Sequence, residues 1–417
     1  LTIFHIVSSL FAIWFVAFSA TRITGALIPQ PRIDVSSPPR DEELPIYTII
    51  AALYREAASV GQLLQAITAL DYPKEKLDVI LVVEPEDQDT RAAIARWGPP
   101  PTFQVLIAPA TLPRTKPKAL NWALPFARGS FVAVYDAEDI PEPNQLRAAL
   151  EAFCAHGLQT MCVQASLCIN NPDDSWLSCM FAAEYAGQFD VFLPGLAVLG
   201  LPLPLGGSSN HFRTAALREI GGWDAYNVTE DADLGFRLAR AGYRAMTFAS
   251  TTFEEAPAQL GGWLRQRSRW MKGWMQTWGV HMRAPRRLWR ETGAKGFLSL
   301  NLLVGGHILT APHGIAHGGD RRRLCLHNGS RLDGTGTAKT VAPKLGAVAH
   351  PDLLGAAVGR GMARAVSVLQ GALSLGKDRA WPGGATARGH AALGRTTSGA
   401  RPGVHHLEQA PRQSLQR

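Results

Sequence analysis

The stretch SFVAVYDAEDIPEP (130–143) joins an apolar run to a turn rich in carboxylates. The run 130–136 is typical of a buried β-strand and ends on Asp136, and Asp139 follows three residues later. Two carboxylates on such a turn can share a hard cation and leave coordination positions open for phosphate oxygens. A solvated acidic turn is the alternative. The stretch therefore predicts a strand whose end is either a cation site or an ordinary turn.

Three similar apolar runs precede this stretch, and helical patterns separate them. The runs that predict buried strands are YTIIAAL (47–53), LDVILVVE (77–84) and FQVLIA (103–108). The helical patterns lie at 56–70, 90–97 and 118–127. This alternation over short loops predicts an α/β fold with a parallel sheet covered by helices. Ligands bind such sheets beyond the carboxyl ends of the strands, where Asp136 and Asp139 fall.

The composition argues against several protein classes. With 417 residues, 46% of them hydrophobic, the chain can bury a substantial core, which excludes disorder throughout. Five cysteines without a CxxC pair argue against a disulfide scaffold or a cysteine zinc site. No GxGxxG or GxxxxGK[ST] loop occurs, which disfavours a dinucleotide-binding domain or a P-loop kinase.

The net charge of +8 is confined to the C-terminal quarter of the chain. Residues 310–417 hold 15 Lys and Arg against five Asp and Glu, whereas the preceding residues hold 27 basic and 29 acidic side chains. The main body is therefore close to neutral, and its charge gives no reason to expect nucleic acid as a partner.

The N-terminal segment is apolar. Residues 1–20 contain no ionisable side chain except His5, so we expect a transmembrane helix at 1–27, with a signal peptide as the alternative. Arg22, Arg32 and Arg40 favour a cytoplasmic location for the domain on their C-terminal side. Residues 28–44 form a Pro-rich linker, and 45–290 form the α/β domain.

The chain changes character near residue 310. The apolar stretch 296–312 is short for a span, so we expect residues 291–312 to form an interfacial helix or a truncated transmembrane helix. Residues 313–417 are rich in Gly, Ala, Arg and His and show no helical or strand period. A disordered basic tail and a lost reading frame both explain them, and the abrupt switch within an apolar run favours the frameshift.

A short acidic motif opens one of the expected helices. TED (229–231) precedes a helical pattern that runs to about residue 241. Asp231 could remove a proton from a bound hydroxyl, or the acidic residues could simply interact with the helix dipole.

Two basic segments have the residue types that bind phosphate and sugar. WLRQRSRWMKGWMQTW (263–278) places an arginine and a tryptophan at helical spacing, suited to a phosphate and a sugar face or to packing at a membrane surface. RTKPKALN (114–121) places Lys116 and Lys118 at a helix start, which suits a diphosphate, although surface lysines are the alternative.

Taken in order, these segments resemble the membrane glycosyltransferases of family 2, the group of cellulose, chitin and hyaluronan synthases. The resemblance covers about residues 45–309 and is carried by ALYREA (52–57), RTKPKALN, DAED (136–139), TED and QRSRW (266–270). It implies a GT-A (nucleotide-diphospho-sugar transferase) domain with flanking transmembrane helices. It also implies a nucleotide-diphosphate sugar as donor and Mg²⁺ or Mn²⁺ as cofactor.

The resemblance assigns residues to the donor. Tyr54 and Glu56 lie where a family motif borders the nucleotide base. Glu84 takes the place of the first aspartate of DDG, a motif that is EPE here. Lys118 fits the KxxALN lysine near the diphosphate, and Arg269 of QxxRW completes this donor set.

It also assigns the reacting and acceptor groups. Asp136 and Asp139 match the metal and diphosphate carboxylates, and Asp231 matches the catalytic base. The residues expected beside the acceptor belong to QxxRW and to the loop GGSSNHF (206–212), and they are Gln266, Trp270, Gly207 and Ser208.

These roles imply an inverting reaction. We expect transfer from a UDP-sugar to a growing β-linked polysaccharide at the inner or plasma membrane, with a cytoplasmic catalytic domain and a glycan or lipid acceptor. The alternatives are transfer of a single sugar to a lipid or glycan, and a non-catalytic membrane remnant with a basic tail. Processive members have several helices after QxxRW, so we also expect this chain to be a truncated or frameshifted copy.

Overall fold

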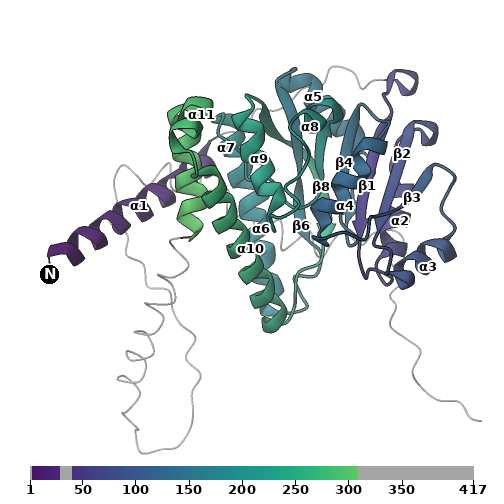
Figure 1. Ribbon diagram of the computed structural model, residues 1–417, viewed down its shortest axis with the longest axis horizontal. Coiled ribbons are helices and arrows are strands. Elements are labelled where there is room, and N and C mark those ends of the chain that lie inside the picture. Colours follow the sequence, from purple (N-terminus) through teal and green to yellow (C-terminus); the bar gives the residue numbers. More distant parts are fainter. Residues whose placement is uncertain (1, 29–39, 309–417) are drawn as a thin grey trace, which may run out of the picture. The chain divides into compact units, whose positions relative to one another are not determined.

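The computed structural model describes residues 2–28 and 40–308 and shows an eight-stranded sheet (Figure 1). The strand order is β3-β2-β1-β4-β7-β6-β8-β5. The strands are β1 (Tyr47–Leu53), β2 (Leu77–Val83), β3 (Phe103–Ile107), β4 (Phe131–Tyr135), β5 (Ile140–Pro141), β6 (Thr160–Ile169), β7 (Asn210–Arg213) and β8 (Arg244–Glu254). The four runs that predicted strands are thus confirmed as β1 to β4.

The predicted parallel strands make up one half of a larger, mixed sheet. The strands β3, β2, β1 and β4 are parallel, and so are β6 and β8. In contrast, β7 is antiparallel to β4 and β6, and β5 is antiparallel to β8. The prediction rested on β1 to β4, for which it is confirmed, and it did not include β5 and β7, because apolar periodicity reports burial and not strand direction. The fold is therefore a mixed α/β fold.

The helices cover both faces of this sheet. They are α2 (Val60–Thr68), α3 (Gln88–Trp97), α4 (Lys116–Ala123), α5 (Gln145–His156), α6 (Trp176–Tyr185), α7 (Leu193–Val198), α8 (Thr214–Glu219) and α9 (Glu230–Arg240), with short 3₁₀ turns η1 (Asp41–Glu43), η2 (Lys74–Lys76) and η3 (Leu124–Phe126). Successive residues of β1 enter different cores: Ile49 and Ala51 face one hydrophobic cluster, and Ile50 faces the other. Burial of both faces explains why the strands are continuous apolar runs.

Local signals place the helices that matter for the site. Thr115 caps α4, because its hydroxyl accepts from the backbone N–H of Lys118 at 3.4 Å, and Pro117 occupies its first turn. Asp87 caps α3, which ends at Gly98 with φ of 69°. Both caps follow strand ends, so α3 and α4 begin at the edge of the sheet where β2 and β3 finish.

The remaining helices lie at the end of the sheet away from β3 (Figure 1). They are α1 (Thr2–Leu27), α10 (Leu260–His281) and α11 (Pro285–Ser299), together with the π-helical segments η4 (Ala186–Phe192) and η5 (Leu300–Gly305). Leu300 and Val304 of η5 pack in a small core with Phe236 and Leu288, so the apolar stretch at 296–308 is buried against α9 and α11.

Among the helices of residues 2–28 and 40–308, none combines the length and apolarity needed to cross a membrane. The basic segment 313–417 and most of the linker lie outside the described residues.

Candidate active site

The carboxyl end of β4 carries the two carboxylates of DAED in different environments. Asp139 is fully buried; its Oδ2 accepts from the backbone N–H of Asp136 at 2.6 Å and from the Ser208 hydroxyl. Its Oδ1 is buried and has no hydrogen-bond partner in the described part of the chain. Burial and the neighbouring Asp136 raise the pKa of Asp139 well above its ordinary value. Asp136 remains partly exposed.

Two lysines at the start of α4 face different carboxylates. Lys116 Nζ forms an ion pair with Asp136 and donates to the Gly207 carbonyl at 2.6 Å. Lys118 Nζ lies 2.7 Å from an oxygen of Glu84 and also donates to the carbonyls of Pro109 and Thr111. Lys118 is therefore held in a buried pair, whereas Lys116 contacts the partly exposed Asp136.

The prediction that Lys118 is the KxxALN lysine needs correction. Counted on the chain, KxxALN begins at Lys116 and ends at Asn121. The correct count identifies the same lysine that contacts Asp136 in the structure. Although burial opposes its charge, Asp136 and Glu230 raise the pKa of Lys116 above its ordinary value, so this side chain stays cationic.

The residues assigned to the nucleotide base lie near the ends of β1 and β2. Tyr54 is 41% exposed, and the Arg55 guanidinium lies 5.1 Å from the centre of its ring. Arg55 has φ of 62°, and its N–H donates to Asp87 at 2.5 Å, which fixes this turn. Glu56 donates its backbone N–H to Thr90, and burial with Asp136 and Asp87 raises the pKa of its carboxyl.

The loop before β7 brings small residues against the carboxylate of Asp231. Gly206 N–H donates to the Gln164 side chain at 2.8 Å, which anchors the loop to β6. A Cβ on Gly207 would lie 3.4 Å from Asp231 Oδ2, so the absence of a side chain keeps the space beside Asp231 open. Ser208 points away into its hydrogen bond with Asp139.

Asp231 sits in the first turn of α9 with a raised pKa. Its Oδ1 accepts from the Ala232 N–H at 2.8 Å. Burial and the adjacent Glu230 raise the pKa of Asp231 to about 7, against the opposing effect of Lys116. Burial raises the pKa of Glu230 as well. A carboxylate with a pKa near neutral can accept a proton from a hydroxyl and release it again.

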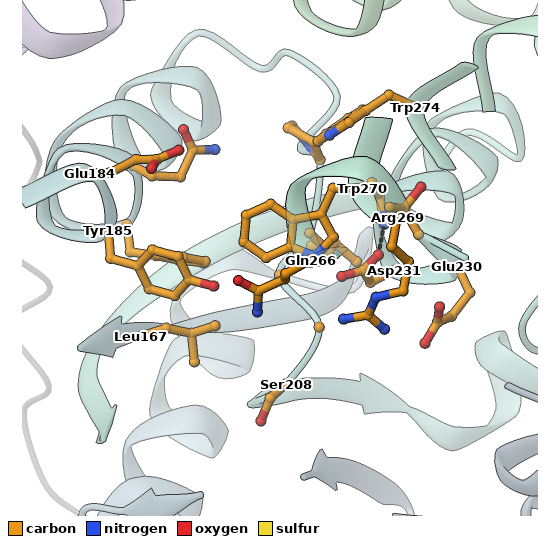
Figure 2. Close-up of a pocket in the computed structure, with 18 of the residues that line it drawn as sticks. Leu167, Glu184, Tyr185, Ser208, Glu230, Asp231, Gln266, Arg269, Trp270 and Trp274 are labelled. Carbon is orange, nitrogen blue, oxygen red and sulfur yellow. Dashed lines mark hydrogen bonds between the residues drawn. The ribbon is translucent and has the colours of Figure 1, made fainter. Parts of the chain in front are cut away.

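The three residues of α10 that were predicted from QxxRW line the same cavity as Asp231. Figure 2 shows Arg269 beside Asp231 and Glu230, with Gln266 and Trp270 on the adjoining side. Gln266 Oε1 is buried without a partner in the described residues, so it is available to a ligand hydroxyl. The Arg269 guanidinium is positioned to neutralise an anion next to the carboxylates.

Contacts that no sequence pattern predicted dock α10 onto α9. A side chain at Gly273 would overlap Thr229, so the helix backbone packs directly on the TED turn. The side chains of Asn227 and Thr277 form a 2.8 Å hydrogen bond in the same buried contact.

A buried histidine joins the two helices farther along. Arg240 donates to His281 Nδ1 at 3.1 Å, which leaves Nε2 of His281 to donate to Asp233 Oδ1 at 3.1 Å. These contacts fix the position of Asp231 relative to Arg269. The sequence did not predict these contacts between α9 and α10, because small and polar residues are common in helices and do not reveal their partners.

Some but not all of the expected residues line the cavity. It has a volume of about 270 Å³, and the expected residues that line it are Asp136, Gly207, Ser208, Asp231, Gln266, Arg269 and Trp270. Tyr54 lines a separate hollow with Asp87, and Glu84 and Lys118 are buried beneath the surface. Four further carboxylates line the cavity, Glu138, Glu184, Glu230 and Glu254. Burial, together with Asp136, raises the pKa of Glu138 to about 7 and that of Glu254 to about 8.

The carboxylates suit a divalent cation that a ligand helps to hold. In residues 2–28 and 40–308, no group of three or more His, Cys, Asp or Glu side chains is arranged to hold a metal. Asp139 nevertheless offers a buried oxygen that has no hydrogen-bond partner in the described residues, and burial beside Asp136 raises its pKa, an effect that a bound cation would offset. Mg²⁺ is commonly bound by one or two carboxylates plus phosphate oxygens. Asp136 and Asp139 fit that kind of site.

Known proteins with similar sequences are sugar transferases. The chain is 25% identical over 242 residues to a probable glycosyltransferase, YdaM, of Bacillus subtilis, which covers 56% of each chain. It is 26% identical over 275 residues to a poly-beta-1,6-N-acetyl-D-glucosamine synthase of Staphylococcus aureus, covering 66% of this chain and 62% of the relative. It is 24% identical over 278 residues to a beta-monoglucosyldiacylglycerol synthase of Trichormus variabilis, covering 65% and 58%. The chain thus spans less than two thirds of these relatives.

A solved structure shares the fold. The mannosyltransferase PcManGT from Pyrobaculum calidifontis, in complex with GDP-Man and Mn²⁺, matches with a TM-score of 0.52 and 21% identity, over 88% of this chain and 98% of that chain. The sequence model of the family described as "Glycosyltransferase like family 2" matches residues 44–273, which is more than half of the chain. This chain therefore belongs to glycosyltransferase family 2.

Proposed function

We propose that this chain transfers a sugar, with inversion, from a UDP-sugar to an acceptor hydroxyl. The observation that supports this most directly is one cavity in which Asp231 lies beside the open space at Gly207, with Arg269, Lys116 and Asp136 around it. A base, cationic groups for a departing diphosphate and a carboxylate for a cation are the parts that such a transfer needs.

The reaction is a single displacement. Asp231 takes the proton of the acceptor hydroxyl as its oxygen attacks the anomeric carbon. The bond between that carbon and the diphosphate oxygen breaks on the opposite face, and its electron pair leaves with the nucleoside diphosphate. Lys116 and Arg269 neutralise this leaving group. An α-linked donor gives a β-glycoside, and no covalent enzyme intermediate forms.

A cation belongs to this proposal. Asp136 and Asp139 would hold Mg²⁺ or Mn²⁺ together with the donor diphosphate, and the ion would supply charge neutralisation during its departure. In the structure Asp136 is paired with Lys116. Binding of the donor with its cation would therefore replace Lys116 by the cation as the partner of Asp136.

Location at the inner or plasma membrane is part of the same proposal, with the catalytic domain on the cytoplasmic side. The observation that supports it is the apolar surface of α1, where Ile13, Phe15, Val16 and Ile23 are each more than half exposed. Several exposed apolar side chains on one helix are typical of a surface that binds a membrane or another protein.

Growth of a β-linked polysaccharide is the proposed outcome, and transfer of one sugar to a lipid is the second candidate. The motif QxxRW supports the first, because Gln266 and Trp270 stand beside the base and can hold a sugar. The second is favoured by Phe192, Trp274 and Leu303, apolar side chains that also line the cavity. Size analysis of radiolabelled product distinguishes a ladder of lengths from a single addition.

The catalytic role is tested by Asp231→Asn. We expect transfer from UDP-glucose or UDP-N-acetylglucosamine to fall at least about 1,000-fold while UDP binding, measured by calorimetry, stays within about threefold. The matched control is Asp173→Asn, which neutralises an exposed carboxylate outside the cavity. Wild-type rates in the Asp231 variant would refute the proposed base, whereas a non-catalytic remnant predicts no transfer by the wild type either.

A further inference from the structure

The cavity contains a guanidinium that its protein partners do not neutralise. Arg22 of α1 lines the same cavity as Asp231. Its Nη2 donates to Gln188 Oε1 of η4 at 3.4 Å, and its guanidinium lies 5.7 Å and 4.8 Å from the ring centres of Phe18 and Phe192. None of these partners carries a negative charge.

Glu184 is the carboxylate that affects the pKa of Arg22, and it is already paired with another arginine. Arg267 donates two hydrogen bonds to Glu184, at 2.7 and 2.5 Å. Across residues 2–28 and 40–308, no carboxylate forms an ion pair with Arg22. A partly buried arginine with donors to spare is suited to an anion from outside the chain.

Close packing of glycines fixes Arg22 at this place. A Cβ on Gly195 of α7 would overlap the Gly25 carbonyl, and a Cβ on Gly25 would lie 3.1 Å from the Phe192 ring. A Cβ on Gly306 would lie 2.5 Å from the Phe18 ring. These contacts let α1 approach α7 and η5 closely on both sides of Arg22, so its position is set by the packing of the helix.

The two sides of the cavity differ in charge. Figure 2 shows Glu230, Asp231 and Arg269 on one side and Glu184 on the other, with Gln266 and Trp270 between them. Asp136 lies on the first side, because Lys116 pairs with it and also interacts with Glu230, and Glu138 and Glu254 line the cavity as well. On the Glu184 side, Arg267 balances that carboxylate, and Arg22 adds a positive charge.

We propose that the acceptor carries a phosphate group that Arg22 binds while the acceptor hydroxyl reaches Asp231. This inference rests on the proposed transferase activity. A guanidinium binds phosphate through paired N–H donors. Because Phe192, Trp274 and Leu303 line the cavity with Arg22, we infer a lipid phosphate; a soluble polyol phosphate would offer the same group without apolar chains.

Binding of short acceptor probes tests the inference without turnover. The full chain is titrated with dihexanoyl-phosphatidylglycerol, dihexanoylglycerol and glycerol 3-phosphate, and tryptophan fluorescence is followed because Trp270 and Trp274 line the cavity. We expect the wild type to bind the phosphatidylglycerol about tenfold more tightly than dihexanoylglycerol. Arg22→Gln should make the two affinities equal, and Arg22→Lys should keep most of the preference.

The control Arg286→Gln removes an exposed arginine of α11 and should leave the preference unchanged. Equal binding of glycerol 3-phosphate and the lipid, lost in Arg22→Gln, would support the phosphate and identify a soluble source. A wild type without preference, or a preference that survives Arg22→Gln, would overturn the inference. The proposed function is tested separately: it would be refuted by normal transfer in the Asp231→Asn variant, a result that does not depend on Arg22.

Discussion

Two lysine–carboxylate pairs stand two residues apart on α4 and differ in what surrounds them. Lys118 pairs with Glu84 at the end of β2, and their side chains are 10% and 6% exposed. Lys116 pairs with Asp136 at the end of β4, and theirs are 24% and 36% exposed. The first pair is enclosed by backbone carbonyls, so it cannot exchange its partners. The second opens to the cavity, so only it can pass from a protein carboxylate to a ligand.

The largest expected difference between the pairs is in activity. Lys116→Met should lower kcat/KM for sugar transfer about 100- to 1,000-fold, because a cation next to the leaving diphosphate is lost. Lys118→Met should reduce the rate only as far as it reduces the fraction of folded protein. Rates normalised to folded protein by circular dichroism provide the measurement. An equal normalised loss in both variants would contradict the comparison.

The same two lysines show what the sequence could and could not predict. Strand β1 was predicted at its observed bounds, and Asp136 at a strand end was correctly placed, because runs of buried residues and the carboxylates after them are local patterns. Which lysine faces which carboxylate depends on β1 lying between β2 and β4 in the sheet. Careful counting of KxxALN would have identified Lys116, but no pattern predicted the Lys118–Glu84 pair.

Contacts between distant segments were missed for a related reason. The Asn227–Thr277 and Asp233–His281 hydrogen bonds join residues about 50 apart in the chain. Ordinary polar side chains on two helices do not reveal their partners until the helices pack. The antiparallel β7 was also missed, because it is only four residues long and the helical segments α6, η4 and α7 separate it from β6.

The second difference concerns stability. Lys118→Met leaves Glu84 buried without its counter-ion and should lower the free energy of unfolding by about 3–5 kcal/mol. Lys116→Met leaves the partly exposed Asp136 in contact with water and should cost at most about 1 kcal/mol. Urea unfolding followed by circular dichroism measures both.

A double variant separates burial of a charge from loss of packing. Glu84→Met together with Lys118→Met removes both charges and should recover most of the stability lost in Lys118→Met alone. If the double variant is no more stable than the single one, the cost comes from packing and not from an unpaired carboxylate.

The third difference is in ligand response. UDP at about 100 times its Kd should stabilise the wild type by about 2.7 kcal/mol, read as a rise in Tm. The Lys116→Met protein should lose most of this rise at the same UDP concentration. The Glu84→Met/Lys118→Met protein should keep it, because its cavity is unchanged. Equal rises in all three proteins would show that Lys116 does not contact the diphosphate.

The smallest expected difference is a shift in pH dependence. In the proposed mechanism Asp231 acts in its charged form, so the wild-type rate should rise with pH through about 7 and then level off. Burial and Glu230 raise the pKa of Asp231, and Lys116 opposes them. Residual transfer by Lys116→Met should therefore have its midpoint at higher pH, by up to about one unit. The Glu84→Met/Lys118→Met protein should keep the wild-type midpoint.

The control for this prediction is Glu138→Gln, because burial raises the pKa of Glu138 to about 7 as well. If this variant loses the pH dependence of transfer, Glu138 and not Asp231 sets the midpoint.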